Sequence, residues 1–228
     1  DCPPLPAGAD PTRWECLVMI VNGGSLTLGG IDQQITQPMK IIVQTGPPAA
    51  GGPNELKQVR MDATPMRIPG GVLGMLGLDV PSWADDIPGN EVLVRPHHAG
   101  GFAFELPNAR VDMRVEILNL LLGDDCFIGT QTEPISFNLI ADLSTLRVIS
   151  PGNPSDPLAQ PFTIAATASD NTFTVPRATC SIWGWPMDWV AGLPSPSGNN
   201  QATFDSYIAI APYAATSTMR DPRTFSID

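Results

Sequence analysis

Charged side chains are scarce in this chain of 228 residues. Asp, Glu, Lys and Arg make up 15% of it, against about 25% in an ordinary soluble domain, and only two are lysines, Lys40 and Lys57. The formal net charge is −11 and the arginines are scattered, so no basic stripe is available to neutralise phosphates. The sequence therefore argues against nucleic acid as a partner and disfavours a surface of anionic lipid head groups.

Signatures of catalysis, nucleotide binding and metal binding are also missing. The sequence contains no G-x-S-x-G, G-x-G-x-x-G, G-x-x-x-x-G-K-[ST] or H-E-x-x-H motif. Its only histidines, His97 and His98, are adjacent, and we expect them in a solvated loop. The acidic pairs 85–86 and 124–125 lack the spacing of a calcium-binding loop. We therefore expect no cofactor, no metal site and no catalytic residue, although a Ser-His-Asp triad can assemble from distant residues.

Long helices are excluded by proline. The chain has 25 Pro and 21 Gly, and only two proline-free stretches reach 26 residues, Thr12–Gln37 and Asn108–Glu133. A proline inside a helix costs roughly 3 kcal/mol, so any helix must be short. No run approaches the roughly 18 apolar residues of a membrane-spanning helix.

What the chain does have is hydrophobic residues, 43% of the total, in alternating patterns. Residues 108–117 place apolar side chains at odd positions and charged ones at even positions, which predicts a strand with one wet face. Weaker alternation follows at 135–139, 162–167 and 204–210. The segment Glu15–Val21 contains the apolar run LVMIV and predicts a strand buried on both faces, followed by a turn at Gly23-Gly24.

These patterns predict an all-β chain: an antiparallel β-sandwich or barrel-like fold with Pro/Gly-rich loops and little helix. We expect a Pro-rich lead-in at 1–14, a single β domain at 15–211 and a C-terminal tail at 212–228. A division of the domain into two sub-sheets, with a boundary near 90–107, is an open alternative.

Four cysteines indicate the compartment. Cys2, Cys16, Cys126 and Cys180 form no C-x-x-C motif and have no His at metal-ligand spacing, which favours disulfides and an oxidising, extracytoplasmic site. Chain order suggests that Cys2 pairs with Cys16 and Cys126 with Cys180, although three connectivities are possible. The sequence begins at Asp1 with no apolar leader, as expected for a mature chain after signal-peptide removal.

Two apolar segments do not fit a simple soluble sandwich. The first is the glycine-rich Ile68–Trp83, and the second is Ser181–Leu193, which contains three tryptophans. Each is either core or an exposed surface that contacts lipid or another subunit. The candidate contact residues are Leu73, Met75, Leu76, Leu78, Trp83, Trp183, Trp185 and Trp189.

The stretch Leu121–Leu139 (LLGDDCFIGTQTEPISFNL) resembles a recurring segment in uncharacterised secreted, cell-envelope-associated β-proteins of actinobacteria. The resemblance extends to Ile68–Asp79, Asp170–Cys180 and Gly192–Ile208, and more loosely to Ser25–Gly46. The resemblance implies a disulfide between Cys126 and Cys180. Some actinobacteria carry an outer lipid layer of mycolic acids, and we expect an association with it on the ground of compartment rather than of a motif. The tryptophan-rich segment and the region after Ala211 depart from the usual pattern.

We therefore expect a non-catalytic extracytoplasmic envelope protein, structural in role, that forms homo-oligomers and contacts envelope lipid. Low charge and scarce lysine support this hypothesis. The first alternative is a porin formed by several subunits, although the predicted strands are shorter than the roughly 9 to 11 residues of a membrane strand. The second alternative is a secreted hydrolase. Because acyl chains anchor proteins to lipid, we also predict O-acylation at Ser82, Ser195 or Ser197.

Overall fold

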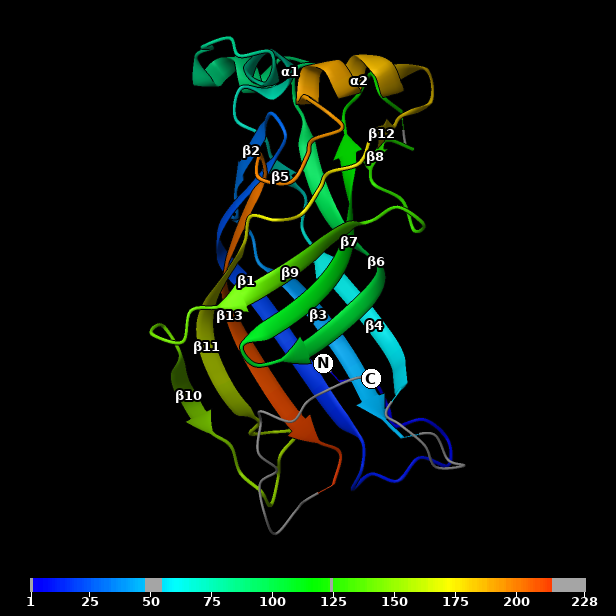
Figure 1. Cartoon of the computed structure of the whole chain (residues 1–228), viewed down its shortest axis with the longest axis vertical. Helices are drawn as coiled ribbons and strands as arrows, with labels where there is room; N and C mark the ends of the chain where they lie inside the picture. Colours follow the sequence, from blue (N-terminus) through cyan, green and yellow to red (C-terminus); the bar gives the residue numbers. More distant parts are fainter. Residues whose placement is uncertain (1, 48–54, 124, 215–228) are drawn as a thin grey trace.

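The computed structural model describes residues 2–47, 55–123 and 125–214 (Figure 1). In that part of the chain the helices are short: α1 (Gly71–Met75), α2 (Gly184–Ala191) and the 3₁₀ helices η1 (Ser82–Asp86) and η2 (Ser181–Trp183). The strands are β1 (Glu15–Leu28), β2 (Ile31–Gln34), β3 (Met39–Gly46), β4 (Glu55–Ala63), β5 (Met66–Arg67), β6 (Leu93–Glu105), β7 (Asn108–Leu118), β8 (Phe127–Ile128), β9 (Ile135–Ala141), β10 (Arg147–Pro151), β11 (Phe162–Asp170), β12 (Ala178–Thr179) and β13 (Gln201–Pro212). The all-β prediction is confirmed.

All these strands belong to one antiparallel sheet. Its path runs β12-β8-β7-β9-β11-β13-β1-β3-β4, and β6 pairs with β5 and β7. The sheet curls until β4 and β6 lie side by side, although each has its hydrogen-bonded ladder with other strands (Figure 1). We call this junction, where β4 and β6 are in contact but are not paired by hydrogen bonds, the seam. Of the two architectures predicted, the curled sheet matches the barrel-like one.

The course of β1 corrects two expectations. Leu17, Met19 and Val21 are buried in the interior, whereas Ile20 is only half-buried, so the strand is not buried on both faces. The glycine pair at 23–24 does not form a turn, because the register with β13 shifts between Val21 and Gly23, which makes Asn22 the extra residue of a bulge, and the strand continues to Leu28. Gly24 has φ +108°, and a Cβ atom there would meet the Thr203 carbonyl oxygen at 1.9 Å.

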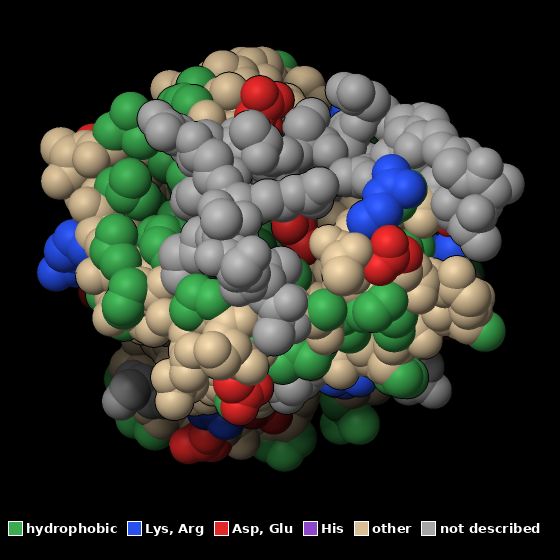
Figure 2. Space-filling model, turned by 90° about the horizontal axis from the view of Figure 1, so that it is seen from below, with side chains coloured by type: hydrophobic (Ala, Val, Ile, Leu, Met, Phe, Trp, Pro, Cys, Tyr) green, Lys and Arg blue, Asp and Glu red, His purple; other side chains and the backbone are tan. Residues whose placement is uncertain are grey.

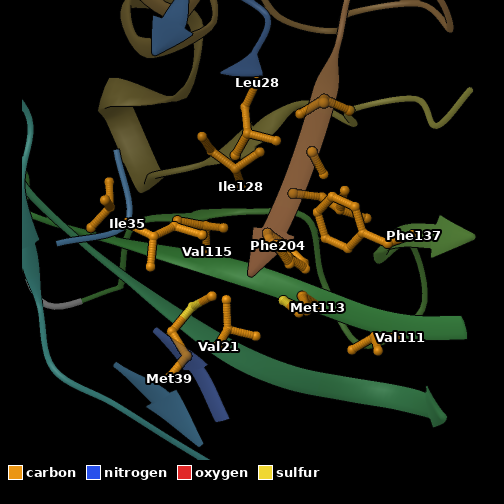
Figure 3. Packing of buried hydrophobic residues seen from close by; sticks show 14 of the residues in the cluster. Val21, Leu28, Ile35, Met39, Val111, Met113, Val115, Ile128, Phe137 and Phe204 are labelled. Atoms are coloured by element: carbon orange, nitrogen blue, oxygen red, sulfur yellow. The ribbon is translucent and has the colours of Figure 1, made fainter. Parts of the chain in front are cut away.

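The core fills the inside of the curled sheet (Figure 3). Phe137 has its ring centroid 4.6 Å from that of Phe173 and 5.8 Å from that of Phe204. The odd-numbered residues of β7 point into this core, as the alternation predicted. The internal cavity beside Phe204 has a volume of about 20 Å³, enough for a single water molecule.

The other face of β7 is wet only in part, because Asn108 and Arg110 are exposed whereas the acidic residues are covered. Asp112 and Glu116 are only 6% and 8% exposed. They lie on the outer surface of the sheet, but Arg110, on the same strand, and Arg95, on β6, extend over them and form ion pairs. The sequence of one strand does not reveal this cover, because half of it comes from the neighbouring strand.

Both predicted disulfides, Cys2–Cys16 and Cys126–Cys180, are present, with Cα atoms 5.9 and 4.0 Å apart. They indicate an oxidising, extracytoplasmic location. Among the described helices, none has the length and apolar character needed to cross a membrane.

The lead-in is attached to the sheet rather than separate from it. Tyr213 donates a hydrogen bond from its hydroxyl to the Pro3 carbonyl oxygen (2.8 Å), and Gln44 donates from its amide to the Pro4 carbonyl oxygen (3.1 Å). Strand β6 runs through the region 90–107 and joins the same sheet as the strands on either side of it in sequence. Most of the predicted tail lies outside the described residues.

Candidate functional site

One end of the elongated molecule carries exposed apolar side chains from three segments, around α1 and η1, after β7, and at η2 and α2 (Figure 1). We call this set the apolar end. Its members are Leu76, Leu78, Trp83, Ile87, Leu120, Leu121, Ile182, Trp183, Trp185 and Trp189. The opposite end, in Figure 2, shows hydrophobic, charged and other polar side chains mixed across its described surface.

Helix α2 turns its tryptophans outward. Trp185 and Trp189 are four residues apart and share one helix face, where they are 76% and 70% exposed. Met187 and Ala191 lie on the other side of the helix and are buried. The Gly30 N–H donates to the Ala191 carbonyl oxygen (2.8 Å), which docks the end of the helix on the turn between β1 and β2.

A buried carboxylate fixes the other side of α2. Asp188 accepts a hydrogen bond from the Ala178 N–H at 2.7 Å and from the Arg177 guanidinium at 3.1 Å. These bonds hold the helix against β12, which the disulfide of Cys180 joins to the segment before β8. The inner face of α2 is therefore fixed against the core, and the face that carries Trp185 and Trp189 points into solvent.

Asn90 holds the first segment in a similar way. Its amide nitrogen donates to the carbonyl oxygens of Ala84 (2.7 Å) and Gly70 (3.1 Å), and its amide oxygen accepts from the Leu73 N–H (2.9 Å). One buried side chain thus ties α1 to η1. The turns between these anchor points carry Leu76, Leu78 and Trp83, and they extend into solvent.

Asn119 adds the second segment to the same end. Its amide nitrogen donates to the carbonyl oxygens of Gly89 (2.9 Å) and Glu91 (2.7 Å), and its oxygen accepts from the Leu121 N–H (2.9 Å). Leu120 and Leu121 are 78% and 60% exposed as a result. Sequence reasoning missed both, although a run of leucines directly before turn-forming residues was a signal for an exposed apolar turn.

The predicted contact residues divide into two groups. Leu73 and Met75 are half-buried, and Met75 packs against the core. The others, Leu76, Leu78, Trp83, Trp183, Trp185 and Trp189, are all exposed, so the alternative that these side chains form core does not hold. The structure adds Ile87, Leu120, Leu121 and Ile182 to them.

The three serines proposed for acylation differ in access. Ser195 is 3% exposed, and its backbone forms an isolated bridge with Val175. Ser197 is exposed, and Ser82 lies in η1, where its side chain is outside the described atoms. Ser197 is therefore the more accessible hydroxyl of the two described, and acylation itself stays a prediction.

The histidine pair lies on a strand rather than in a solvated loop, so that expectation was wrong. His97 and His98 are part of β6 and both are half-buried. His97 Nε2 lies 2.7 Å from Glu116 Oε2, which also accepts a hydrogen bond from Arg95 Nε at 2.7 Å. Burial lowers the pKa of His98 and outweighs the backbone hydrogen bond at Gly101, which favours the protonated ring.

Glu116 makes the stability of the fold depend on acid pH. Burial alone would raise the pKa of its carboxyl group, but the hydrogen bonds and charges of His97 and Arg95 hold the pKa below its ordinary value. Such a group stabilises the fold above its unfolded pKa of about 4.3, and the contribution disappears as the pH falls through the lower folded pKa. In urea unfolding, wild type should exceed Glu116→Gln in stability at pH 6, and the gap should close below about pH 4.

The control for this measurement is Glu105→Gln, a substitution of an exposed residue at the end of the neighbouring strand β6. A difference between wild type and Glu116→Gln that stays constant from pH 6 to pH 3 would contradict the assignment.

The described part of the chain contains no group of three His, Cys, Asp or Glu residues that could hold a metal ion. Comparison with known proteins finds no match for the chain among family models, curated proteins or solved structures.

Proposed function

We propose that this protein belongs to the cell envelope and binds a lipid surface through its apolar end. The observation that carries the proposal is the exposure of Trp83, Trp185 and Trp189, which are 67%, 76% and 70% accessible at the same end of the molecule. Fully burying one large apolar side chain is worth about 1.5 to 3 kcal/mol. Three anchored segments that present such side chains together can therefore hold the protein on a layer of acyl chains.

A lipid layer suits this end better than a second copy of the chain. The exposed side chains project from turns and short helices of three separate segments, so each can enter a fluid surface independently. A tryptophan ring can bury its carbon atoms among acyl chains while its N–H stays at the polar boundary. Two copies would also have to approach against a net charge of −11 on each.

The head groups of that layer should be uncharged. Asp79 and Asp125 are exposed beside the apolar segments. Asp86 pairs with Arg67, which also pairs with Glu91. Anionic head groups would be repelled by these acids. The outer layer of mycolic acids that some actinobacteria carry presents long acyl chains, and it is the layer that we propose.

We expect the double variant Trp185→Ser/Trp189→Ser to bind phosphatidylcholine vesicles about 100-fold more weakly than wild type, because each lost ring forfeits about 1.5 kcal/mol of burial. Vesicle flotation over a range of lipid concentrations measures the affinity. Adding phosphatidylglycerol to the vesicles should weaken wild-type binding, and salt should restore it.

The matched control is Val148→Ser/Ile149→Ser on β10, since these residues are 62% and 52% exposed away from the apolar end. Equal loss in both double variants would refute a specific lipid-contact surface. If the tryptophan variant changed only the oligomeric state in sedimentation and left vesicle binding intact, the apolar end would be a subunit interface instead.

A further inference from the structure

A second candidate site lies on the outer surface of the sheet. A groove with a volume of about 760 Å³ runs over β9. The turn of the β6–β7 hairpin lines one side of it, and the end of β11 and the start of β13 line the other. None of the lining residues belongs to the apolar end, so the groove is a separate feature of the molecule.

The groove forms where β9 and β11 diverge. Strand β9 pairs with β7 along most of its length but meets β11 only at Ile140 and Ala141 (Figure 1). The buried carboxylate of Asp170 bridges the gap between the two strands. It accepts hydrogen bonds from the Asn138 N–H and the Thr172 N–H, both at 2.7 Å. The floor of the groove is therefore held in place without a continuous ladder.

Backbone donors along this floor are already occupied. The Ala141 N–H donates to the Pro107 carbonyl oxygen at 2.7 Å, and the Asp142 N–H donates to the Thr167 carbonyl oxygen at 2.9 Å. The Asn138 N–H is used by the bond described above. A peptide that binds as an added strand needs free backbone groups on the protein. Recognition in this groove must therefore use side chains.

The groove collects side-chain amides that are not engaged elsewhere. Four exposed amides line it and make no side-chain hydrogen bond within the described part of the chain: Asn108, Asn138, Asn171 and Gln201. Each amide offers both donors and an acceptor. Ile140, which is 60% exposed, adds an apolar surface to the floor. The lining thus suits a ligand that combines hydroxyl groups with C–H surfaces.

Charge in the groove disfavours anionic ligands. Three carboxylates line it, those of Glu105, Asp142 and Asp170. Arg110 is the only cation among the described lining residues, and it already pairs with Asp112 at 3.3 Å. A carboxylate or phosphate on a ligand would meet these acids without a free cation to balance it. The ligand should therefore be uncharged.

We propose that this groove binds a neutral oligosaccharide. Sugar hydroxyl groups both donate and accept hydrogen bonds, so they match the free amides of Asn108, Asn138, Asn171 and Gln201. The C–H face of a sugar ring can pack on Ile140. The volume of the groove is in the range of small-molecule sites. The groove is open to solvent, so a longer chain of sugars can extend beyond it.

Titration calorimetry with linear neutral hexasaccharides tests the proposal. Maltohexaose, cellohexaose, laminarihexaose and mannohexaose are the probes, and we expect saturable binding of at least one of them with a Kd below about 1 mM. A hexasaccharide of galacturonic acid should bind at least about tenfold more weakly, because its carboxylates meet Glu105 and Asp142. Absence of saturable binding for all four neutral probes would overturn the proposal.

Gln201→Ala should weaken binding of the tightest neutral probe by about tenfold, because it removes hydrogen-bond partners of the sugar. Gln34→Ala is the matched control: it makes the same change at an exposed position of β2 outside the groove and should leave binding unchanged. Asn138→Ala is the second test, on the floor, and it keeps the backbone bond to Asp170. In NMR spectra of isotope-labelled protein, the side-chain amide signals of Asn138 and Gln201 should shift on titration.

Equal effects of the two glutamine variants would overturn the proposal, as would equally tight binding of the galacturonic acid hexasaccharide. Loss of sugar binding in Trp185→Ser/Trp189→Ser would place the sugar at the apolar end instead. Gln201→Ala should bind phosphatidylcholine vesicles as wild type does, so failure of the groove and failure of the lipid-surface proposal can be told apart.

Discussion

Removal of the Cys126–Cys180 disulfide is expected to lower the free energy of unfolding by about 4 kcal/mol. The two cysteines are 54 residues apart in sequence, and the chain-entropy model assigns roughly this stabilisation to a loop of that length. The double variant Cys126→Ala/Cys180→Ala retains the buried, apolar character of both positions. Urea unfolding at equilibrium gives the difference from wild type.

The second disulfide provides the comparison. Cys2→Ala/Cys16→Ala opens a loop with a separation of only 14 residues, for which the same model gives about 3 kcal/mol. The longer loop should therefore be the more costly to open. A larger loss for the Cys2 variant would show that packing around the lead-in, rather than loop entropy, governs the effect.

Phe137→Ala should destabilise the fold by about 3 to 5 kcal/mol, because it deletes a ring that is fully buried between Phe173 and Phe204. The curled sheet closes around this ring, so the walls of the resulting cavity cannot collapse easily. In thermal unfolding, the midpoint should fall by on the order of 10 °C.

Trp185→Ala is the matched control, since it also deletes a large ring but at a position that is 76% exposed. Its effect on stability should stay within about 0.5 kcal/mol. Comparable destabilisation by both substitutions would mean that Trp185 belongs to the core, which would also remove the basis of the proposed lipid contact.

The sequence predicted those parts of the fold that depend on local pattern. The alternation of residues 108–117 gave the strand and its inward face, and the spacing of proline excluded long helices. The wet face expected for Glu116 was wrong because its cover comes from Arg95 on another strand. Local pattern also could not distinguish a turn at Gly23-Gly24 from a bulge just before it, because glycine is common in both.

The sequence predicted which segments form the candidate site, but not that their side chains are exposed. Composition identified the apolar and tryptophan-rich segments, but their exposure depends on anchors such as Asn90 and Asp188, whose partners are distant or backbone groups.

The pairing of β1 with β13 also constrains how this protein is made. Glu15 lies opposite Pro212, so β1, an inner strand of the sheet, has its second edge covered only when the last described strand pairs with it. During synthesis, β1, β3 and β4 can form a meander early, but the open edge of β1 and its apolar face stay exposed until β13 emerges. Contacts of such large sequence separation form slowly. The sheet of the nascent chain can therefore be completed only after β13 has been synthesised and released.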